Sequence, residues 1–223
     1  MTGVQTCALP IYLRFAGILT HAGQSYYCGT KEGRLVVARH ERDVMVELAN
    51  RLRQSGIEVP TVSIGSTPTL TIVDHLDGID EARPGSYIFF DAFMAAIGSC
   101  RLDDCALSVL AAVVHRDRTR NKIVIDAGAI ALSKDEGPVE FDAACGYGQL
   151  LDLEGNDLGA KIESLSQEHG QATVDSAVIE LLKVGTRVRV VPNHSCLTAA
   201  QHSHYHVLEN GKIVDRWHTQ QGW

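Results

Sequence analysis

The order of strand-like and helix-like segments in residues 12 to 67 constrains the fold of this chain more than any other feature. LRFAGILTHAG is typical of a buried strand that ends in a small-residue loop, and IEVPTVSIGST repeats the pattern. Between them, residues 35 to 56 carry apolar positions at mostly helical spacing, and Gly56 marks the expected helix end. This order predicts a β-α-β unit of a parallel α/β fold. We expect a third short strand at SYIFFDAF, residues 86 to 93.

The second half of the chain has a different pattern. From about residue 96, strand-like runs with turn residues between them take over. They are CALSVLAAVVHRD, NKIVIDAGAIAL, YGQLLDLEGND, TRVRVVPNHSC and HYHVLENGKIVDRW, the last with an Asn-Gly pair that favours a tight hairpin. A lone β-α-β unit cannot close a barrel or cover both faces of a parallel sheet. The predicted fold class is therefore α/β plus β: a partial (β/α) barrel over residues 12–95, followed by an antiparallel β domain over residues 96–223.

Charge and composition exclude several classes of partner. The 223 residues carry a formal net charge of −7 with a pI of about 5.8, and no basic cluster. This balance argues against nucleic acid or an anionic membrane surface as a partner. The longest apolar runs are too short to cross a bilayer. Six cysteines without a C-x-x-C pair indicate no disulfide framework and favour a reducing, cytoplasmic setting.

The first eleven residues, MTGVQTCALPI, lack the basic region and long apolar core of a signal peptide. They resemble a translated sequencing-adapter oligonucleotide with its first codon read as Met. We therefore exclude residues 1–11 from the fold prediction and expect the chain to be the C-terminal part of a longer protein. The alternative is an unusual native N-terminus.

The segment VVPNHSCLTAAQHSHYH, residues 190 to 206, combines histidine and cysteine in a pattern that suits a metal. On a strand, His194 and Cys196 point to the same face, and imidazole and thiolate are both good zinc ligands. Two protein ligands leave coordination positions open for water or substrate, as in a catalytic site. His202, His204 and His206 are candidates for further ligands. The alternative is a buried cysteine with hydrogen-bonded histidines on a β surface.

Two turns rich in glycine and serine follow successive strands of the predicted α/β part. SIGSTPT offers backbone N–H groups and two hydroxyls at the C-terminal end of a parallel strand, where α/β barrels bind phosphate. RPGSY, residues 83 to 87, is a second such turn, and the two could hold one phosphate between them. Each is otherwise a simple connecting turn.

Seven motifs in order resemble one known family. HAGQSYYC, SIGSTPT, EARPGSYIFFD, VIDAGAIALSKD, LSQEHG, VPNHSCLTAAQ and VDRW followed by GW are similar to the C-terminal two-thirds of eukaryotic-type, zinc-dependent D-serine dehydratases. The wider group includes D-threonine aldolases and has an alanine racemase-like fold of the pyridoxal phosphate-dependent fold type III. The resemblance implies a pyridoxal phosphate-binding barrel, a β domain with a metal site, and a homodimer.

The resemblance also implies roles for individual residues. His194 and Cys196 match the zinc pair, and cysteine at the second position resembles the dehydratases, because the aldolases more often have aspartate there. The phosphate cradle matches Ser66, Thr67, Gly85 and Ser86. Tyr26, or its neighbour Tyr27, matches a tyrosine near the pyridine ring, and Arg83 stands where alanine racemases place an arginine. Gln167 and His169 match a catalytic-site motif, although His169 can also be a structural histidine.

The family's Schiff-base lysine has no counterpart in a matching context. The lysines all lie in polar or charged segments: Lys31, Lys122, Lys134, Lys161, Lys183 and Lys212. The resemblance implies that the intact enzyme uses pyridoxal 5'-phosphate and Zn²⁺ to convert D-serine, a small D-amino acid, to pyruvate and ammonia. The 223-residue chain itself is expected to be an inactive fragment that lacks the Schiff-base lysine. The alternatives for the function are a D-threonine aldolase or D-3-hydroxyaspartate-type enzyme and a non-enzymatic pyridoxal phosphate carrier.

Overall fold

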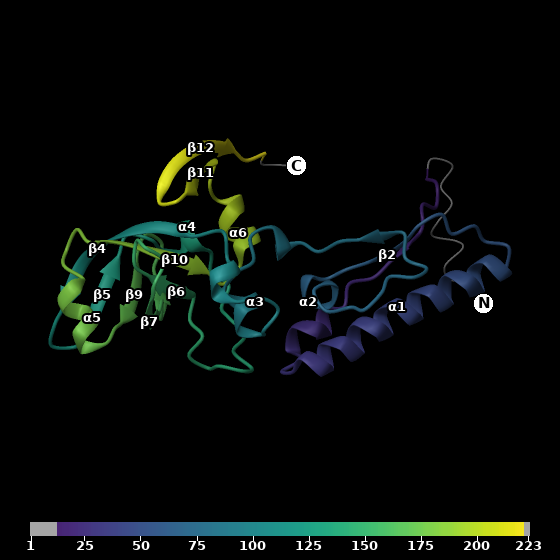
Figure 1. Ribbon diagram of the computed structural model, residues 1–223, viewed down its shortest axis with the longest axis horizontal. Helices are drawn as coiled ribbons and strands as arrows, with labels where there is room; N and C mark the ends of the chain where they lie inside the picture. The colour runs from purple at the N-terminus through teal and green to yellow at the C-terminus, as the bar shows by residue number, and fades with distance from the viewer. Residues whose placement is uncertain (1–12, 221–223) are drawn as a thin grey trace. The chain divides into compact units, whose positions relative to one another are not determined.

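The structure, a computed structural model, describes residues 13 to 220. The expectation about residues 1–11 falls outside this range. The chain divides between Gly85 and Ser86 into two compact units, each with its own hydrophobic core (Figure 1).

A small parallel sheet and one long helix form the first unit (Figure 1). The strands lie in the order β1-β2-β3, and both neighbouring pairs are parallel. The elements are β1 (Ile18–Leu19), a 3₁₀ helix (Gly23–Tyr27), α1 (Lys31–Gln54), β2 (Val62–Ile64), α2 (Thr67–Leu70) and β3 (Glu81–Ala82). Two parallel strands joined by a helix are the predicted β-α-β unit, so that prediction is confirmed.

Helix α1 begins and ends at residues that cap it. The Thr30 hydroxyl accepts a hydrogen bond from the Gly33 N–H at 3.0 Å, which satisfies one of the free donors of the first turn. After the last turn, Gly56 has a φ of +80°, a conformation that glycine adopts without steric cost. The helix buries Met45 and Ala49 against β2, and this small core comprises Met45, Ala49, Val59, Val62 and Ile64.

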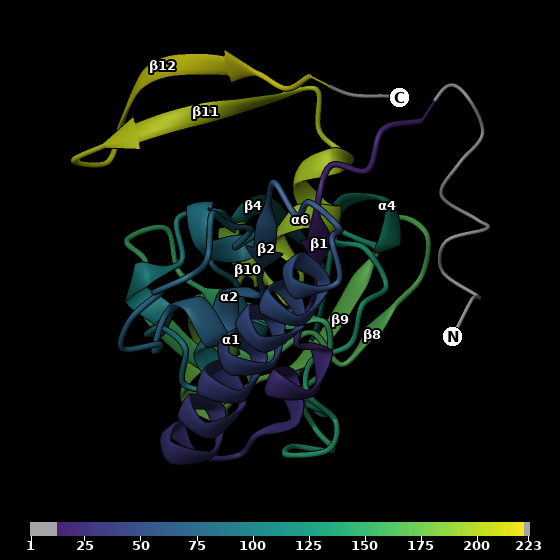
Figure 2. The same ribbon diagram turned by 90° about the vertical axis from the view of Figure 1, so that its right-hand side faces the viewer.

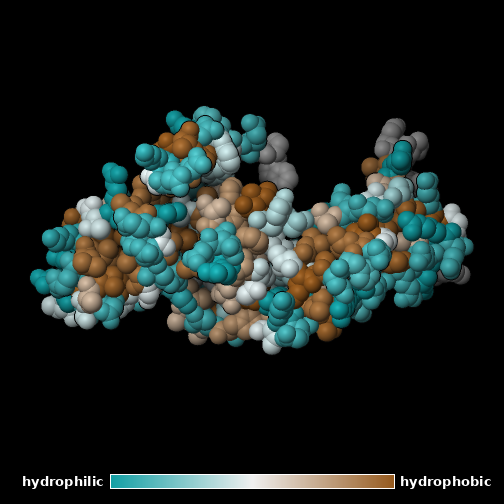
Figure 3. All heavy atoms as spheres, viewed as in Figure 1, coloured by the Kyte–Doolittle hydropathy of each residue, from teal (hydrophilic) through white to brown (hydrophobic). Residues whose placement is uncertain are grey.

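The prediction of a buried strand at LRFAGILTHAG is wrong in part. Only Ile18 and Leu19 form a strand, and the Leu19 side chain is 70% exposed. Leu13 and Phe15 before it are also exposed. β1 pairs only with β2 and therefore lies at an edge of the sheet. Of this apolar run, Ile18 is partly buried and packs against the small core of the unit. Figure 3 shows apolar side chains at the surface among hydrophilic ones.

The prediction of a third strand at residues 86 to 93 is wrong. Ser86–Ile88 is a 3₁₀ helix, and α3 (Ala92–Ala96) follows. Phe90 has a φ of +49°, and the Asp91 carboxylate accepts a hydrogen bond from the Met94 N–H at 2.9 Å as the cap of α3. A positive φ and a helix cap are incompatible with a continuous strand. The third strand of the parallel sheet is instead β3.

The second unit contains an antiparallel sheet of seven strands, which agrees with the predicted antiparallel β domain. Their order is β7-β6-β10-β4-β5-β9-β8, and every neighbouring pair is antiparallel. The strands are β4 (Val109–Asp117), β5 (Lys122–Ile125), β6 (Gly148–Leu151), β7 (Asp157–Lys161), β8 (Ser164–Leu165), β9 (Gly170–Thr173) and β10 (Arg187–Pro192). Besides α3 and the 3₁₀ helix Ser86–Ile88, the short helices of this unit are α4 (Ala129–Leu132), α5 (Ser176–Leu181), α6 (Ser195–Ala200) and the 3₁₀ helix Leu102–Asp104. The strand expected over NKIVIDAGAIAL is therefore correct only for its first half, and α4 forms the rest.

Alternating residues of the central strands build the core of this unit. Ala111 and Val113 of β4 and Val188 and Val190 of β10 lie on its inner face and are almost completely buried. Burying each of the valine side chains contributes about 1.5–3 kcal/mol relative to leaving it exposed. The predicted α/β plus β fold class is therefore confirmed.

The chain continues into the hairpin of β11 (His204–Glu209) and β12 (Lys212–His218), which extends away from the sheet of its unit (Figures 1 and 2). Asn210 and Gly211 connect its strands, with φ angles of +50° and +74°. Two successive positive φ angles are the requirement of the tight turn that Asn-Gly favours, so the hairpin prediction is confirmed. Within residues 13 to 220, no helix has the length and apolar character to span a membrane.

Candidate active site

His194 and Cys196 lie at the start of helix α6, directly after β10. His194 is the N-cap residue of the helix, and Cys196 is in its first turn. The expectation that both residues project from one face of a strand is therefore wrong, because β10 ends at Pro192. The two side chains nevertheless interact, and the interaction with Cys196 is the largest influence on the pKa of His194. The helix start brings together the pair that strand periodicity predicted.

Asp135 is a third member of this cluster, and nothing in its sequence context predicts that role. Its carboxylate lies 2.5 Å from His194 Nδ1, and both side chains are nearly half exposed. Asp135 follows α4, which ends at Leu132, so it comes from a separate segment of the same unit. A carboxylate on Nδ1 fixes the orientation of the ring and leaves Nε2 as the nitrogen for a metal.

The charges around His194 favour its protonated form. The side chain of Cys196 and then Asp135 raise the pKa of His194 to about 9, although burial acts in the opposite direction. The folded-state pKa of His194 exceeds the ordinary value of 6.5. The ion pair between His194 and Asp135 therefore stabilises the fold fully below pH 6.5. That contribution is lost as the pH rises through about 9.

We expect Asp135→Asn to lower the pKa of His194 in the metal-free chain toward 6.5. Cys196→Ala, made as a separate single variant, should lower this pKa by a larger amount. NMR titration of the His194 ring protons measures both changes. Glu180→Gln is the control. Glu180 lies on α5 and forms an exposed ion pair with Arg118, so its loss should leave the pKa of His194 near 9. A His194 pKa that is the same in all four proteins would contradict the geometry described here.

A buried carboxylate holds the start of α6 in place. Asp91 is 2% exposed and accepts hydrogen bonds from the N–H and the hydroxyl of Ser195, at 3.1 and 3.3 Å. Burial raises the pKa of Asp91, and the N–H groups of Met94 and Ser195 partly offset that rise. Thr198, one turn later, donates from its hydroxyl to the Leu132 carbonyl at 2.8 Å. Asp91 therefore positions the residue between His194 and Cys196.

The three histidines proposed as further ligands do not join this cluster. His202 Nε2 lies 3.0 Å from the Ala131 carbonyl oxygen. The rings of His204 and His206 pack edge to face with centroids 5.2 Å apart, on the hairpin strand β11. In the part of the chain that the structure describes, no three His, Cys, Asp or Glu side chains are arranged to hold a metal ion. His194 and Cys196 thus remain a two-residue candidate pair.

Gln167 and His169 are exposed residues of the turn between β8 and β9. Gln167 Nε2 donates to Glu168 at 3.1 Å. The backbone of the turn contacts the start of α4, where the Ala129 N–H donates to the Ser166 carbonyl at 2.9 Å. The turn therefore supports α4, the helix that precedes Asp135.

We expect Gly128→Ala to destabilise this junction by about 2 kcal/mol, as overpacking does. A Cβ at Gly128 would lie 2.4 Å from the backbone of Gln167 and of His169, and backbone atoms cannot move aside cheaply. Urea unfolding measures the change. Gly85→Ala is the matched control, because a Cβ there meets no atom within 4 Å. Equal stability of the two variants would contradict the close contact.

The predicted phosphate residues of the first unit lie at the buried end of β2. Ser66 and Thr67 are each 1% exposed. The Ser66 hydroxyl caps α2 and lies 2.8 Å from the Thr69 hydroxyl and 3.1 Å from the Ser25 hydroxyl. It is thus already engaged within the unit. Gly85 is exposed at the end of this unit, and Ser86 begins the second unit.

Tyr26 and Arg83 both have partners inside the first unit. The Tyr26 ring stacks on His21 with centroids 5.9 Å apart, while Tyr27 is 61% exposed. Arg83 donates from Nε to the Ser63 hydroxyl at 2.8 Å and from its other end to the Thr20 carbonyl. Arg83 therefore connects β2 with the residue that follows β1.

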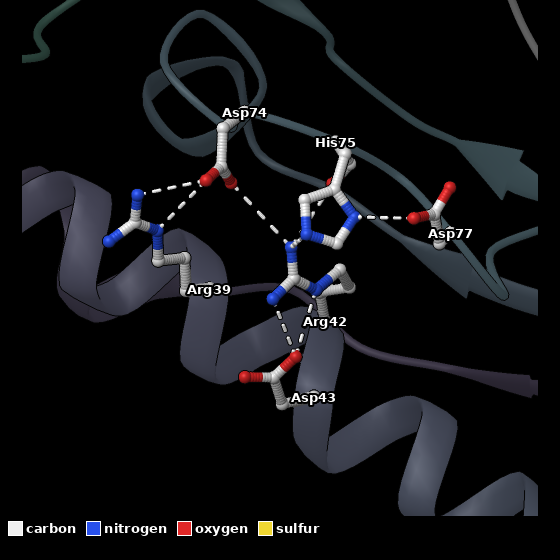
Figure 4. Close-up of polar contacts among 6 residues, drawn as sticks. All are labelled: Arg39, Arg42, Asp43, Asp74, His75 and Asp77. Atoms are coloured by element: carbon white, nitrogen blue, oxygen red, sulfur yellow. Dashed lines mark hydrogen bonds and ion pairs between the residues drawn. The ribbon is translucent and has the colours of Figure 1, made fainter.

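A separate polar network on α1 contains none of the predicted site residues (Figure 4). Arg42 lies between its neighbours, with Nη1 2.5 Å from His75 Nε2 and Nη2 2.7 Å from Asp43. Asp74 binds Arg39 at 2.8 Å. A hollow of about 390 Å³ beside this network is lined by Arg42, Asp43, Val46, Glu47, Asn50, Arg51, Gln54, His75 and Asp77. We attribute the arrangement to packing of the loop after α2 on α1.

Two family models match successive parts of the chain. "Alanine racemase, N-terminal domain" matches residues 4–92, and "Putative serine dehydratase domain" matches residues 106–208. Among curated proteins, the D-threo-3-hydroxyaspartate dehydratase of Delftia sp. (strain HT23) is 39% identical over 95% of this chain and 57% of its own length. The D-serine dehydratase of Dictyostelium discoideum is 35% identical over 95% of this chain and 55% of its own. The chain thus spans about half the length of these relatives.

Solved structures agree with these matches. The Delftia dehydratase superposes with a TM-score of 0.87 over 95% of this chain and 57% of its own. It has also been solved as a metal-free cysteine-to-alanine mutant and as a histidine-to-alanine mutant, at positions two residues apart. A D-threonine aldolase from Filomicrobium marinum is 28% identical, with a TM-score of 0.73 over 92% of this chain and 53% of its own. The chain therefore belongs to the group of D-serine dehydratases and D-threonine aldolases with an alanine racemase-like fold.

Proposed function

We propose that the chain acts as part of a D-amino acid lyase that uses pyridoxal 5'-phosphate and zinc. The proposed reaction removes water from D-serine to give pyruvate and ammonia, in a cytoplasmic homodimer. The observation that carries the proposal is the cluster of His194 and Cys196 with Asp135 on the imidazole. The relatives add one supporting observation. The histidine and cysteine that are mutated in the Delftia dehydratase structures are two positions apart, as His194 and Cys196 are in this chain.

The residues present fit a zinc ion. Asp135 bonds to Nδ1 of His194, so Nε2 of His194 and the Cys196 thiolate are the donors toward a metal. Thiolate and imidazole favour zinc over the hard cations that prefer oxygen. Zinc would supply a Lewis acid for the β-hydroxyl of the substrate, which is a poor leaving group. Asp91 and Ser195 keep the two ligands at the helix start.

The residues present fit pyridoxal phosphate in part. Thr67 and the backbone after β2, with Gly85 and Ser86, would hold the phosphate, and Tyr26 would lie near the ring. The Ser66 hydroxyl, bound to Ser25 and Thr69, would contribute through its backbone instead. The cofactor would supply an electron sink for the carbanion at Cα. In residues 13 to 85 the single lysine is Lys31, which is exposed at the start of α1. We place the Schiff-base lysine in the half of the relatives that this chain does not match.

A second candidate is a D-threo-3-hydroxyaspartate dehydratase, since the Delftia relative has the higher identity of the two dehydratases, 39% against 35%. A D-threonine aldolase would use the same metal while Cα–Cβ breaks. Cys196 favours a dehydratase, because the aldolases more often have aspartate at that position.

The test is a chimera in which residues 13–223 replace the matching part of the Delftia dehydratase. We expect pyruvate and ammonia from D-serine, and loss of turnover after zinc is removed by a chelator and its recovery when zinc is added back. Oxaloacetate formed faster from D-threo-3-hydroxyaspartate would favour the second candidate. Glycine and an aldehyde from D-threonine, without pyruvate from D-serine, would contradict the dehydratase proposal.

A further inference from the structure

Two cysteines outside the candidate metal site form a pair in the second unit. Cys100 and Cys105 flank the 3₁₀ helix Leu102–Asp104. The Asp104 N–H donates to the Arg101 carbonyl at 3.0 Å, and the Cys105 N–H donates to the Leu102 carbonyl at 3.1 Å. The chain therefore turns back on itself between the two residues, and Cys105 Sγ donates to the carbonyl oxygen of Arg101, the residue after Cys100, at 3.9 Å. Both thiols are partly exposed and free.

The surroundings make the two thiols unequal. The interaction of the two thiols lowers the pKa of Cys100 and raises that of Cys105. The backbone N–H of Asp91 also lowers the pKa of Cys100, while burial and nearby carboxylates act in the opposite direction. A thiolate is the nucleophile in thiol oxidation, and a neighbouring thiol then resolves the product.

We propose that Cys100 and Cys105 form an oxidation site, at which hydrogen peroxide produces an intramolecular disulfide. The Cys100 sulfur attacks one oxygen of the peroxide and the O–O bond breaks. Cys100 becomes a sulfenic acid, and the other peroxide oxygen leaves as water. The Cys105 sulfur then attacks the Cys100 sulfur, the S–O bond breaks, and a second water leaves. The two cysteines lose two electrons and two protons in total, and one peroxide is reduced to two waters.

The site lies beside the support of helix α6. Asp91 influences the pKa of Cys100 and holds Ser195 through its carboxylate. The cysteine pair shares no residue with the candidate metal pair, His194 and Cys196. Cys145, by comparison, is buried near the Gly137 backbone, and burial raises its pKa, so it is the less reactive thiol.

The test treats the reduced 223-residue chain with hydrogen peroxide, alkylates the remaining thiols and digests without a reductant. Trypsin cleaves after Arg101, between the two cysteines, so a disulfide joins two separate peptides. We expect a linked pair containing Cys100 and Cys105 that a reductant separates. Recovery of both cysteines in the alkylated form, or linkage of Cys100 to a different cysteine, would overturn the proposal.

Two single variants distinguish the roles of the thiols. In Cys105→Ser, the sulfenic acid of Cys100 persists and reacts with dimedone, which mass spectrometry detects. In Cys100→Ser, neither the linked peptides nor dimedone labelling at Cys105 appears. Cys28→Ser is the matched control and retains the linked pair. Dimedone labelling of Cys105 in Cys100→Ser, without labelling of Cys100 in Cys105→Ser, would contradict the assigned order.

Discussion

Asp91→Ala is expected to lower the free energy of unfolding by about 3 kcal/mol, since it removes a helix cap and leaves buried donors without partners. The Asp91 carboxylate accepts hydrogen bonds from the Met94 N–H, the Ser195 N–H and the Ser195 hydroxyl. Ser195 is 0% exposed, so water cannot replace the lost acceptor without opening the structure. The loss affects α3 and the start of α6 together.

Urea unfolding followed by circular dichroism measures this change. Asp91→Asn keeps one carbonyl oxygen as an acceptor and is expected to lose less stability than the alanine variant. Asp103→Ala is the control, because its exposed ion pair with Arg101 is of the kind that contributes less than about 1 kcal/mol. A loss for Asp91→Ala no larger than that of Asp103→Ala would show that Asp91 does not support α6.

Cys196→Ala in the chimera is expected to lower turnover of D-serine by at least about 100-fold. Loss of the thiolate removes one of two protein donors, and Lewis-acid stabilisation of a leaving hydroxide contributes several kcal/mol to the barrier, with each 1.36 kcal/mol equal to about tenfold in rate. The effect falls on kcat, because the metal acts on charge that develops as the C–O bond breaks.

Leu197→Ala is the matched control for this measurement. Leu197 is the next residue of α6 and is 43% exposed, so its loss tests any general disturbance of the helix start. We expect its kcat to stay near that of the unchanged chimera. Undiminished D-serine turnover by Cys196→Ala would contradict the role assigned to the metal pair.

The fold could be predicted where local signals and tertiary packing agree. Helix α1 has a threonine cap and a glycine after its end, and the β11–β12 hairpin has Asn210 and Gly211 at positions that require positive φ. The aromatic residues of SYIFFDAF favour a strand, but Asp91 acts as a helix cap whose hydrogen-bond partner Met94 follows it in the chain. β1 was predicted too long, because apolar residues at a sheet edge resemble those of a buried strand.

The candidate metal pair could be found from sequence because its two residues are neighbours in the chain. The strand geometry used to predict it was wrong, and the start of α6 brings the pair together instead. Asp135 and Asp91 could not be found in this way. Asp135 is 59 positions from His194, and Asp91 is 104 positions from Ser195, so only the folded sheet places them beside α6.

Zinc binding by the 223-residue chain tests the central claim most directly. Calorimetric titration of the reduced, metal-free chain is expected to show one zinc ion per chain. Binding should be lost in Cys196→Ala and about tenfold weaker in Asp135→Asn, which removes the support of the imidazole. Leu197→Ala should bind zinc as the unchanged chain does. A chain that binds no zinc, or a Cys196→Ala variant that binds it equally well, would contradict the assignment of His194 and Cys196 as metal ligands.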